Sequence, residues 1–263
     1  MSFIVVSDLH LGPRDYTLQA GFARFLDFVR PEAEAIIING DLFSFWFGYH
    51  DVVPYCYVPA LSKMLELADC GVRFTYLHGN HDFAPGPFFE HCLAATVFSD
   101  SAQLDYQGAR VHLEHGDLVD REDTGYKLLR TVVRSRPVTW LFQLVPPHIG
   151  LSVANWCAEI SRSYVISKNT GFYYHCFESG FRRMRAGADL VVYGHGHQTI
   201  FSEMIVDERR KLLVMIAGFA EGGLCFLRLS KDSSGLFVFD MESGQETALH
   251  LFDIASLGKG IEV

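Results

Sequence analysis

Five short polar segments in this chain each follow directly on a run of apolar, largely β-branched residues. Such runs indicate buried strands, and their alternation with helical patterns indicates parallel strands joined by crossover helices. Open α/β sheets place their ligands just past the carboxyl ends of the strands. The segments are Asp8-Leu9-His10, Gly40-Asp41, Gly79-Asn80-His81-Asp82, His115-Gly116-Asp117 and Gly194-His195-Gly196-His197. We therefore expect an α/β protein whose chemistry is gathered at one edge of its sheets.

Apolar periodicity divides the chain into three parts. In the first, strands are expected over 3–7, 35–39, 72–77 and 111–114, with helices from Thr17 to Pro31 and from Pro59 to Asp69. The middle part is helical in pattern. The last is typical of a strand followed by antiparallel hairpins, over 188–193, 199–206, 212–217, 223–229 and 236–239, with turns at 207–210 and 231–235. This order predicts two packed sheets with outer helices: a core of residues 1–120 and 186–263, and a helical cap inserted over 121–185.

Composition excludes several classes of function. A net charge of −9 argues against a general nucleic-acid binder, which would need many Lys and Arg for phosphate contacts. Six cysteines without a C-x-x-C pair suggest neither a disulfide framework nor a structural zinc site. The first strand begins almost at the first residue, leaving no basic head and apolar stretch of a signal peptide. We expect a cytoplasmic protein, soluble or peripheral to a membrane.

The polar segments together supply the donors of a dinuclear metal centre. Each alone is ambiguous, because a histidine after a strand is more often structural and an aspartate in a loop is more often a turn former or helix cap. Hydrolysis of a phosphoester at neutral pH requires a strong nucleophile and charge neutralisation, which two cations about 3.5–4 Å apart provide. One ion is assigned to Asp8, His10, Asp41 and His197, and the other to Asp41, Asn80, His115 and His195, with Asp41 bridging. Nitrogen and oxygen donors without thiolate favour two divalent ions, Mn²⁺ first and Fe, Co or Zn as alternatives.

The order D-x-H, G-D, G-N-H-D, H-G-D, G-H-x-H resembles the calcineurin-like metallophosphoesterase superfamily. The resemblance implies a four-layer αββα sandwich, a metal-bridging hydroxide as nucleophile and the ligand assignment given above. It also implies that His81 is a catalytic residue and not a ligand, since this position contacts the phosphate and helps to protonate the leaving oxygen. Asn80 would stabilise the added charge, and Asp82 would orient His81.

The cap has an unusual balance of charge and hydrophobicity. Residues 121–185 contain ten Lys or Arg against four Asp or Glu, together with many aliphatic side chains. A basic and apolar insertion beside a phosphoesterase centre suits an anionic amphiphile, whose phosphate would meet arginine and whose chains would meet the aliphatic residues. The alternative is an ordinary pair of helices with a solvated basic face.

A closer resemblance concerns the substrate. Segments 7–11, 39–43 with Trp46, 78–83 and 115–126 resemble the UDP-2,3-diacylglucosamine pyrophosphatases of lipid A synthesis, which cleave a diphosphate and are peripheral to the inner membrane. The resemblance implies that Asp123, Ser161 and Lys168 contact the glucosamine and phosphate, the alternative being surface polar residues or a helix cap. This chain departs from that group at His81, where arginine is common, and at Val165, where a polar residue is usual.

We therefore predict hydrolysis of UDP-2,3-diacylglucosamine, an anionic phospho-sugar lipid, to UMP and 2,3-diacylglucosamine 1-phosphate. One alternative is a general phosphodiesterase or phosphatase acting on nucleotides or other soluble phosphoesters. A second is a scaffold that binds partners through a former active site. A scaffold would be expected to have lost ligands, and all of the expected ligands are present in this chain.

Overall fold

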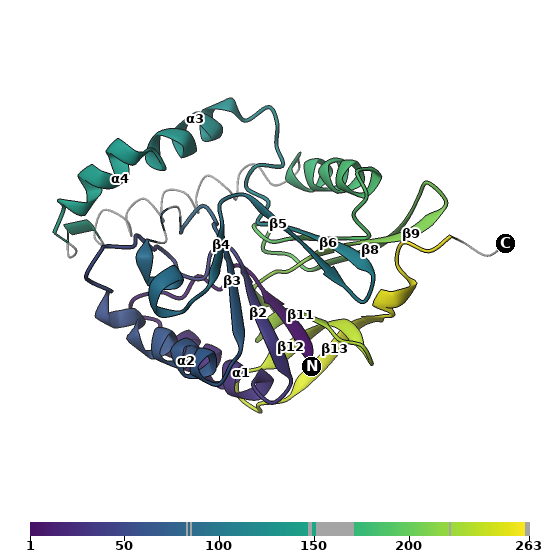
Figure 1. Cartoon of the computed structure of the whole chain (residues 1–263), viewed down its shortest axis with the longest axis horizontal. Helices are drawn as coiled ribbons and strands as arrows, with labels where there is room; N and C mark the ends of the chain where they lie inside the picture. Colours follow the sequence, from purple (N-terminus) through teal and green to yellow (C-terminus); the bar gives the residue numbers. More distant parts are fainter. Residues whose placement is uncertain (83, 85, 147–148, 151–170, 221, 261–263) are drawn as a thin grey trace.

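The computed structural model describes the chain except residues 83, 85, 147–148, 151–170, 221 and 261–263, and it contains two β-sheets (Figure 1). The first sheet has the strand order β13-β12-β11-β1-β2-β3-β4, with β10 paired to β11. Its strands are β1 (Ser2–Val6), β2 (Ala33–Asn39), β3 (Arg73–Leu77), β4 (Thr96–Phe98), β10 (Phe219–Ala220), β11 (Gly223–Leu229), β12 (Ser234–Asp240) and β13 (Glu246–Phe252). The strands β1 to β4 are parallel, as the crossover helices require.

The second sheet has five strands in the order β5-β6-β7-β9-β8. They are β5 (Ser101–Tyr106), β6 (Ala109–Glu114), β7 (Leu190–Tyr193), β8 (Ile200–Val206) and β9 (Arg209–Met215). The strands β6, β7 and β9 are parallel, and β5 and β8 are antiparallel to their neighbours. In each sheet, the parallel strands that precede polar segments therefore all end at the same edge of that sheet.

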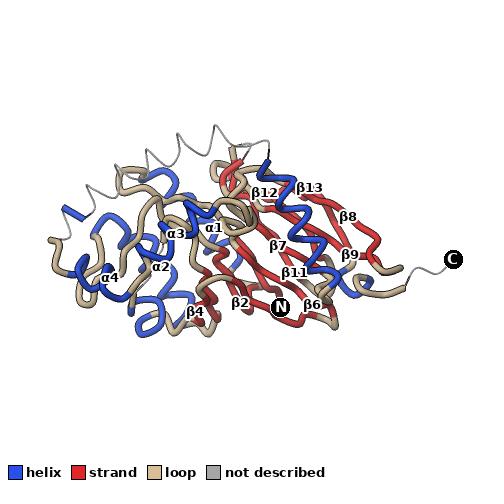
Figure 2. The backbone as a smooth tube through the Cα atoms, turned by 90° about the horizontal axis from the view of Figure 1, so that it is seen from above, coloured by secondary structure: helices blue, strands red, loops and turns tan. Residues whose placement is uncertain are grey.

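The central strands are apolar on both faces because each sheet is covered on both sides. In β1, Ile4 and Val6 face one apolar cluster while Val5 faces another. The first cluster lies between the first sheet and helices α1 (Tyr16–Val29) and α2 (Val58–Asp69), and the second lies between the two sheets. A third cluster joins the second sheet to the helix over 171–185, which lies over this sheet in Figure 2. These three clusters separate four layers, helix–sheet–sheet–helix, as the sequence predicts.

The described part of the cap is formed by α3 (Thr124–Val133) and α4 (Arg136–Gln143), which project from one end of the sheets (Figure 1). Neither helix buries any of its residues fully. The Phe142 ring of α4 packs on Phe45 and Phe47, in the loop after β2, and Gln143 donates to the carbonyl of Gly48 at 2.9 Å. The cap boundaries at 121 and 185 stay predictions, and the helix over 171–185 contacts the second sheet through Cys176 and Met184.

Three short helical turns also lie in the described part of the chain, over Tyr55–Tyr57, Phe88–Cys92 and Ile254–Ser256. The sequence did not predict β4, β5, β10 and β13. Of these, β4, β5 and β13 contain polar or exposed residues, and β10 has only two residues. The expected hairpins are confirmed for β8 with β9 and for β11 with β12. The expectation is wrong between β9 and β11, which lie in different sheets, and β9 pairs instead with β7 in parallel fashion. The turn between β8 and β9 is also shorter than expected: Asp207 and Glu208 both have positive φ, 50° and 61°, as a two-residue type I′ turn requires.

We expect Phe25→Ala to lower the free energy of unfolding by about 3–5 kcal/mol. Phe25 is fully buried and packs edge to face on Phe226 and Phe239, so alanine leaves a cavity between α1 and the first sheet. Urea denaturation followed by circular dichroism measures the change. Tyr55→Ala removes an aromatic ring that is 85% exposed and should change stability by less than about 0.5 kcal/mol. A loss at Phe25 no larger than at Tyr55 would contradict the assigned packing.

Candidate metal centre

The five polar segments meet at the carboxyl ends of β1, β2, β3, β6 and β7, where backbone and side-chain hydrogen bonds join them. The amide of His81 donates to Asp41 Oδ1 at 2.8 Å, and the amide of His195 donates to Asp8 Oδ2 at 2.8 Å. The amide of Asp8 donates to the carbonyl of Gly40 at 3.1 Å. Segments from both sheets, separated by up to 187 positions in the sequence, are thus held together as predicted.

Asp41 lies at the centre of this arrangement. Its Oδ2 atom is 3.4 Å from His115 Nε2, 3.7 Å from His10 Nε2 and 3.9 Å from His81 Nε2. Asp41 is 1% exposed, so its carboxylate is screened little by solvent. One carboxylate with imidazole nitrogens on either side is the arrangement that a bridging ligand requires.

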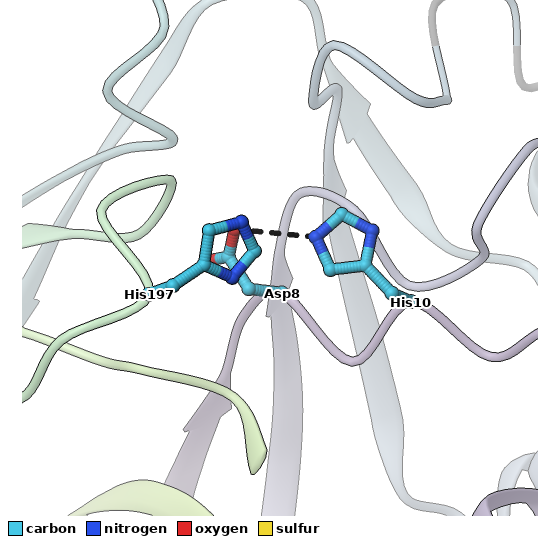
Figure 3. Close-up of side chains that lie close together, drawn as sticks. All are labelled: Asp8, His10 and His197. Carbon is cyan, nitrogen blue, oxygen red and sulfur yellow. Dashed lines mark ion pairs between the residues drawn. The ribbon is translucent and has the colours of Figure 1, made fainter. Parts of the chain in front are cut away.

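Three groups of donors lie around Asp41, and one of them combines Asp41 with His10 and His81. The other two match the predicted ion sites. Asp8, His10 and His197 each offer a ligand atom within 4.8 Å of the others, and Figure 3 shows these three side chains, from the loops after β1 and β7, directed toward one another. Asp41, His115 and His195 form the second group by the same measure. Asn80 joins it, since its Oδ1 atom lies 3.1 Å from His115 Nε2. The structure therefore brings together all seven residues that the sequence predicts as ligands.

Several buried donor atoms in these groups fit metal ions. Asp8 Oδ1 and both ring nitrogens of His10 are buried and have no hydrogen-bond partner among the described residues. His115 Nδ1 lies 2.9 Å from the Asn39 carbonyl oxygen, which can only accept, so Nδ1 carries the proton and Nε2 is left to face the site. Metal-binding histidines usually donate their second nitrogen to a carbonyl in this way. The donor set thus matches two divalent cations.

The charges of the site also favour cations. Burial lowers the pKa of His10 to about 3 and of His195 to about 4, so both rings are neutral near pH 7, with lone pairs available. Burial alone would raise the pKa of Asp41, but His115 and His81 outweigh it and hold that pKa well below its usual value. Burial of Asp8, opposed in part by His115, raises its pKa. Adjacent buried carboxylates of this kind are stabilised by a positive ion.

Backbone strain is concentrated at the same residues. Of the nine non-glycine residues with positive φ in the described part of the chain, five are predicted ligands. They are Asp8, His10, Asp41, His195 and His197, with φ between 44° and 64°. A left-handed conformation costs a non-glycine residue about 1 kcal/mol or more and persists at functional sites that over-determine it.

Two glycines allow the loops to approach the carboxylates. A Cβ atom on Gly79 would lie 2.0 Å from Asp41 Oδ1, and one on Gly194 would lie 1.9 Å from Ser7 Oγ and 2.3 Å from Asp8 Oδ2. No larger residue fits at either position without displacing a carboxylate or the loop that carries it.

The orientation of His81 differs from the expectation. His81 Nδ1 lies 2.7 Å from the carbonyl oxygen of Ser44, which fixes the ring and turns Nε2 toward Asp41. Asp82 is fully buried and its Oδ2 accepts from the Tyr76 hydroxyl at 2.7 Å. Asp82 therefore anchors the loop to β3, whereas a backbone carbonyl orients His81. The sequence contains no signal for Ser44, because any residue has a carbonyl.

Of the three predicted substrate contacts in the cap, one lies in the described chain. Asp123 is the N-cap of α3 and accepts from the amide of Tyr126 at 2.9 Å. Ser161 and Lys168 lie outside the described residues, as does Val165. Contacts of Asp123, Ser161 and Lys168 with substrate stay predictions.

Two polar residues that support the ligands, Ser7 and Asn39, were not predicted as part of the site. Asn39 Nδ2 donates to the carbonyl of Glu114 at 3.1 Å, and the Asn39 carbonyl accepts from Ser7 Oγ at 2.8 Å. Asn39 thus joins the ends of β1, β2 and β6. It is the last residue of an apolar strand, and a fully buried amide there was the available signal.

Comparison with known proteins identifies the family. The sequence profile described as calcineurin-like phosphoesterase matches residues 1–199. A protein named UDP-2,3-diacylglucosamine hydrolase from Aeromonas salmonicida is 30% identical over 224 residues, which are 85% of this chain and 88% of that protein. A protein of the same name from Azotobacter vinelandii is 30% identical over 236 residues, which are 89% of this chain and 96% of that protein.

Solved structures support the fold alone. The structure of GAP50, the anchor in the inner membrane complex of Plasmodium, aligns with a TM-score of 0.50 at 11% identity, covering 99% of this chain and 90% of that one. Within the described residues, no helix is both long and apolar enough to cross a membrane.

Proposed function

This chain belongs to the calcineurin-like phosphoesterase family, and we propose that it hydrolyses the diphosphate of UDP-2,3-diacylglucosamine, releasing UMP and 2,3-diacylglucosamine 1-phosphate. The family implies divalent metal ions, and the relatives named as hydrolases of this substrate cover most of the chain. The observation that carries the proposal is the position of Asp41, whose Oδ2 lies between histidine nitrogens from three loops.

The two donor groups would each hold one ion, preferably Mn²⁺. Asp8, His10 and His197 would hold the first and Asn80, His115 and His195 the second, with Asp41 shared. When bound, two such ions generate a nucleophile from water at neutral pH and neutralise charge on the phosphoryl oxygens. The protein contributes fixed donors on strained loops, so little reorganisation is needed during the reaction.

His81 would assist the leaving oxygen. Because the Ser44 carbonyl occupies Nδ1, only Nε2 can exchange a proton with substrate, and protonation there requires the imidazolium form. Asn80 has a second role in this proposal, since its amide nitrogen can donate to a phosphoryl oxygen while Oδ1 faces the second ion. The carboxylate of Asp82, held by Tyr76, keeps the loop that carries both residues against β3.

The cap would receive the acylated sugar. Leu128 on α3 and Trp140 and Leu141 on α4 are 68%, 65% and 59% exposed, an uncommon exposure for large apolar side chains on neighbouring helices. Basic residues accompany them in the cap. This combination suits acyl chains with an anionic head and a peripheral location on the cytoplasmic face of the inner membrane.

Three substrates offered in parallel test the proposal: UDP-2,3-diacylglucosamine, a UDP-sugar without acyl chains, and bis-p-nitrophenyl phosphate, each with Mn²⁺. We expect kcat/KM to be at least about 10²-fold higher for UDP-2,3-diacylglucosamine than for the UDP-sugar without acyl chains, because burying only four methylenes of the acyl chains contributes about 3 kcal/mol. Release of UMP is measured by chromatography, and release of nitrophenolate by absorbance.

Two other outcomes would point elsewhere. Preference for bis-p-nitrophenyl phosphate would favour the alternative of a general phosphodiesterase or phosphatase acting on soluble phosphoesters. No turnover of any of the three by folded, Mn²⁺-loaded protein would refute the enzymatic proposal altogether.

A further inference from the structure

Arg130 in α3 and Arg134, the C-cap residue of that helix, contact two of the ligand-bearing loops. Arg130 and Arg134 are one helical turn apart, so their side chains leave the same face of the helix. Arg130 Nε donates to Asp117 Oδ2 at 3.1 Å, in the loop that begins with His115. Arg134 Nη2 donates to the carbonyl of Gly79 at 2.8 Å, in the loop that carries Asn80. Both arginines also donate to the Ser99 carbonyl.

The Gly79 carbonyl belongs to the peptide plane that leads into Asn80. Because the peptide unit is planar, a hydrogen bond to this oxygen also fixes the direction of the Asn80 amide and the position of its Cα atom. Asn80 Oδ1 must stay beside His115 Nε2, 3.1 Å away, if both are to reach one ion. Gly79 itself is packed against Asp41, so a rotation of this plane would also disturb the shared carboxylate.

Arg134 occupies an unfavourable position for a residue with no role beyond folding. Its side chain is 14% exposed, and its buried Nε has no hydrogen-bond partner among the described residues. The nearest carboxylate in an ion pair with it, Asp100, is 3.9 Å away. Burial, with the neighbouring charge of Arg130, lowers the pKa of Arg134. A desolvated guanidinium with an unpaired nitrogen lowers the free energy of unfolding. Stability of the fold therefore does not explain why Arg134 donates to the carbonyls of Gly79 and Ser99.

We propose that Arg134 is a positioning residue for Asn80, which couples the seating of the cap on the core to the affinity of the second ion. This inference rests on the proposed dinuclear function. Arg134 contacts neither ion nor substrate in this account. It acts from the cap through the Gly79 carbonyl, and Arg130 acts in parallel on the loop after β6, with the Tyr126 hydroxyl donating to the same Asp117 carboxylate at 2.5 Å.

Calorimetric titration of metal-free protein with Mn²⁺ gives the test. We expect Arg134→Ala to weaken binding of the second ion about 10-fold or more, as loss of outer-shell support commonly does, while the first ion binds within about 2-fold of wild type. Arg134→Lys should restore part of the affinity, because an ammonium can still reach one carbonyl. Arg136→Ala removes the same charge from an exposed cap residue and should leave both affinities unchanged. If Arg134→Ala does not fold, Arg134→Met, which keeps an aliphatic stem but has no donor, replaces it and should weaken the second ion in the same way.

A double-mutant cycle separates positioning from general support of the fold. If Arg134 acts through Asn80, Arg134→Ala should have no further effect on the second ion in an Asn80→Ala background, so that the two effects are strongly non-additive. Additive effects, or an unchanged second ion in Arg134→Ala, would overturn the inference. A wild-type protein that binds fewer than two ions would instead refute the dinuclear function, so the two failures are distinguishable.

Discussion

Asp41→Ala should reduce turnover of the preferred substrate at least about 10³-fold. Its Oδ2 lies between both donor groups, so the substitution dismantles two sites at once and removes several kcal/mol of transition-state stabilisation. Steady-state release of UMP with saturating Mn²⁺ measures the loss of activity. Inductively coupled plasma mass spectrometry of the dialysed protein measures the loss of metal.

The fold should survive this substitution. Asp41 contributes to raising the pKa of both Asp8 and Asp82, so it repels these two buried carboxyls. The neighbouring histidines nevertheless hold the pKa of Asp41 well below its usual value, so its carboxylate stabilises the fold near pH 7, and we expect metal-free Asp41→Ala to stay folded with a melting temperature a few degrees below that of wild type. Asp69→Ala, at an exposed position at the end of α2, is the matched control and should retain metal and activity. Two ions still bound to Asp41→Ala would be incompatible with a shared carboxylate.

His81→Ala should lower kcat about 10²-fold to 10⁴-fold while both ions remain bound. This range is the usual contribution of a general acid, and His81 lies outside the two groups assigned to the ions. Rapid-quench measurement of a single turnover gives the rate of the chemical step, and metal content is measured on the same sample.

A comparison of substrates whose leaving groups differ in pKa makes this prediction more specific, because a leaving group with a low pKa needs little protonation. The defect of His81→Ala should be smaller with bis-p-nitrophenyl phosphate, whose nitrophenolate leaves without a proton, than with diphenyl phosphate, whose phenolate is far more basic. His91→Ala changes an exposed histidine in the short helical turn over Phe88–Cys92 and serves as the control. An equal loss with both substrates, or loss of metal from His81→Ala, would argue against a role as proton donor.

The centre of the molecule was predictable from local sequence. Runs such as Ala35–Ile38 are apolar at every position, which identifies strands covered on both faces, and alternate residues do face different layers. The polar segments could be placed at one edge of the sheets because parallel strands align their carboxyl ends. Asp41 was identifiable as the shared ligand only through its place in the order of the five segments.

Features that depend on contacts between distant residues were not predictable. The parallel pairing of β7 with β9 requires β8 to form the sheet edge, and no local pattern distinguishes this from a simple run of hairpins. Glu208 is an unusual residue for a type I′ turn, so the two-residue connection had no sequence signal. The hydrogen bond from Arg134 to the Gly79 carbonyl joins residues 55 positions apart. No local pattern distinguishes Arg134 from the other basic residues of the cap.

The dinuclear centre is tested most directly by anomalous diffraction from crystals of the protein grown with Mn²⁺. The account predicts two manganese peaks about 3.5–4 Å apart on either side of Asp41 Oδ2, one near Asp8, His10 and His197 and the other near Asn80, His115 and His195. A single peak, or peaks that do not share Asp41, would contradict it.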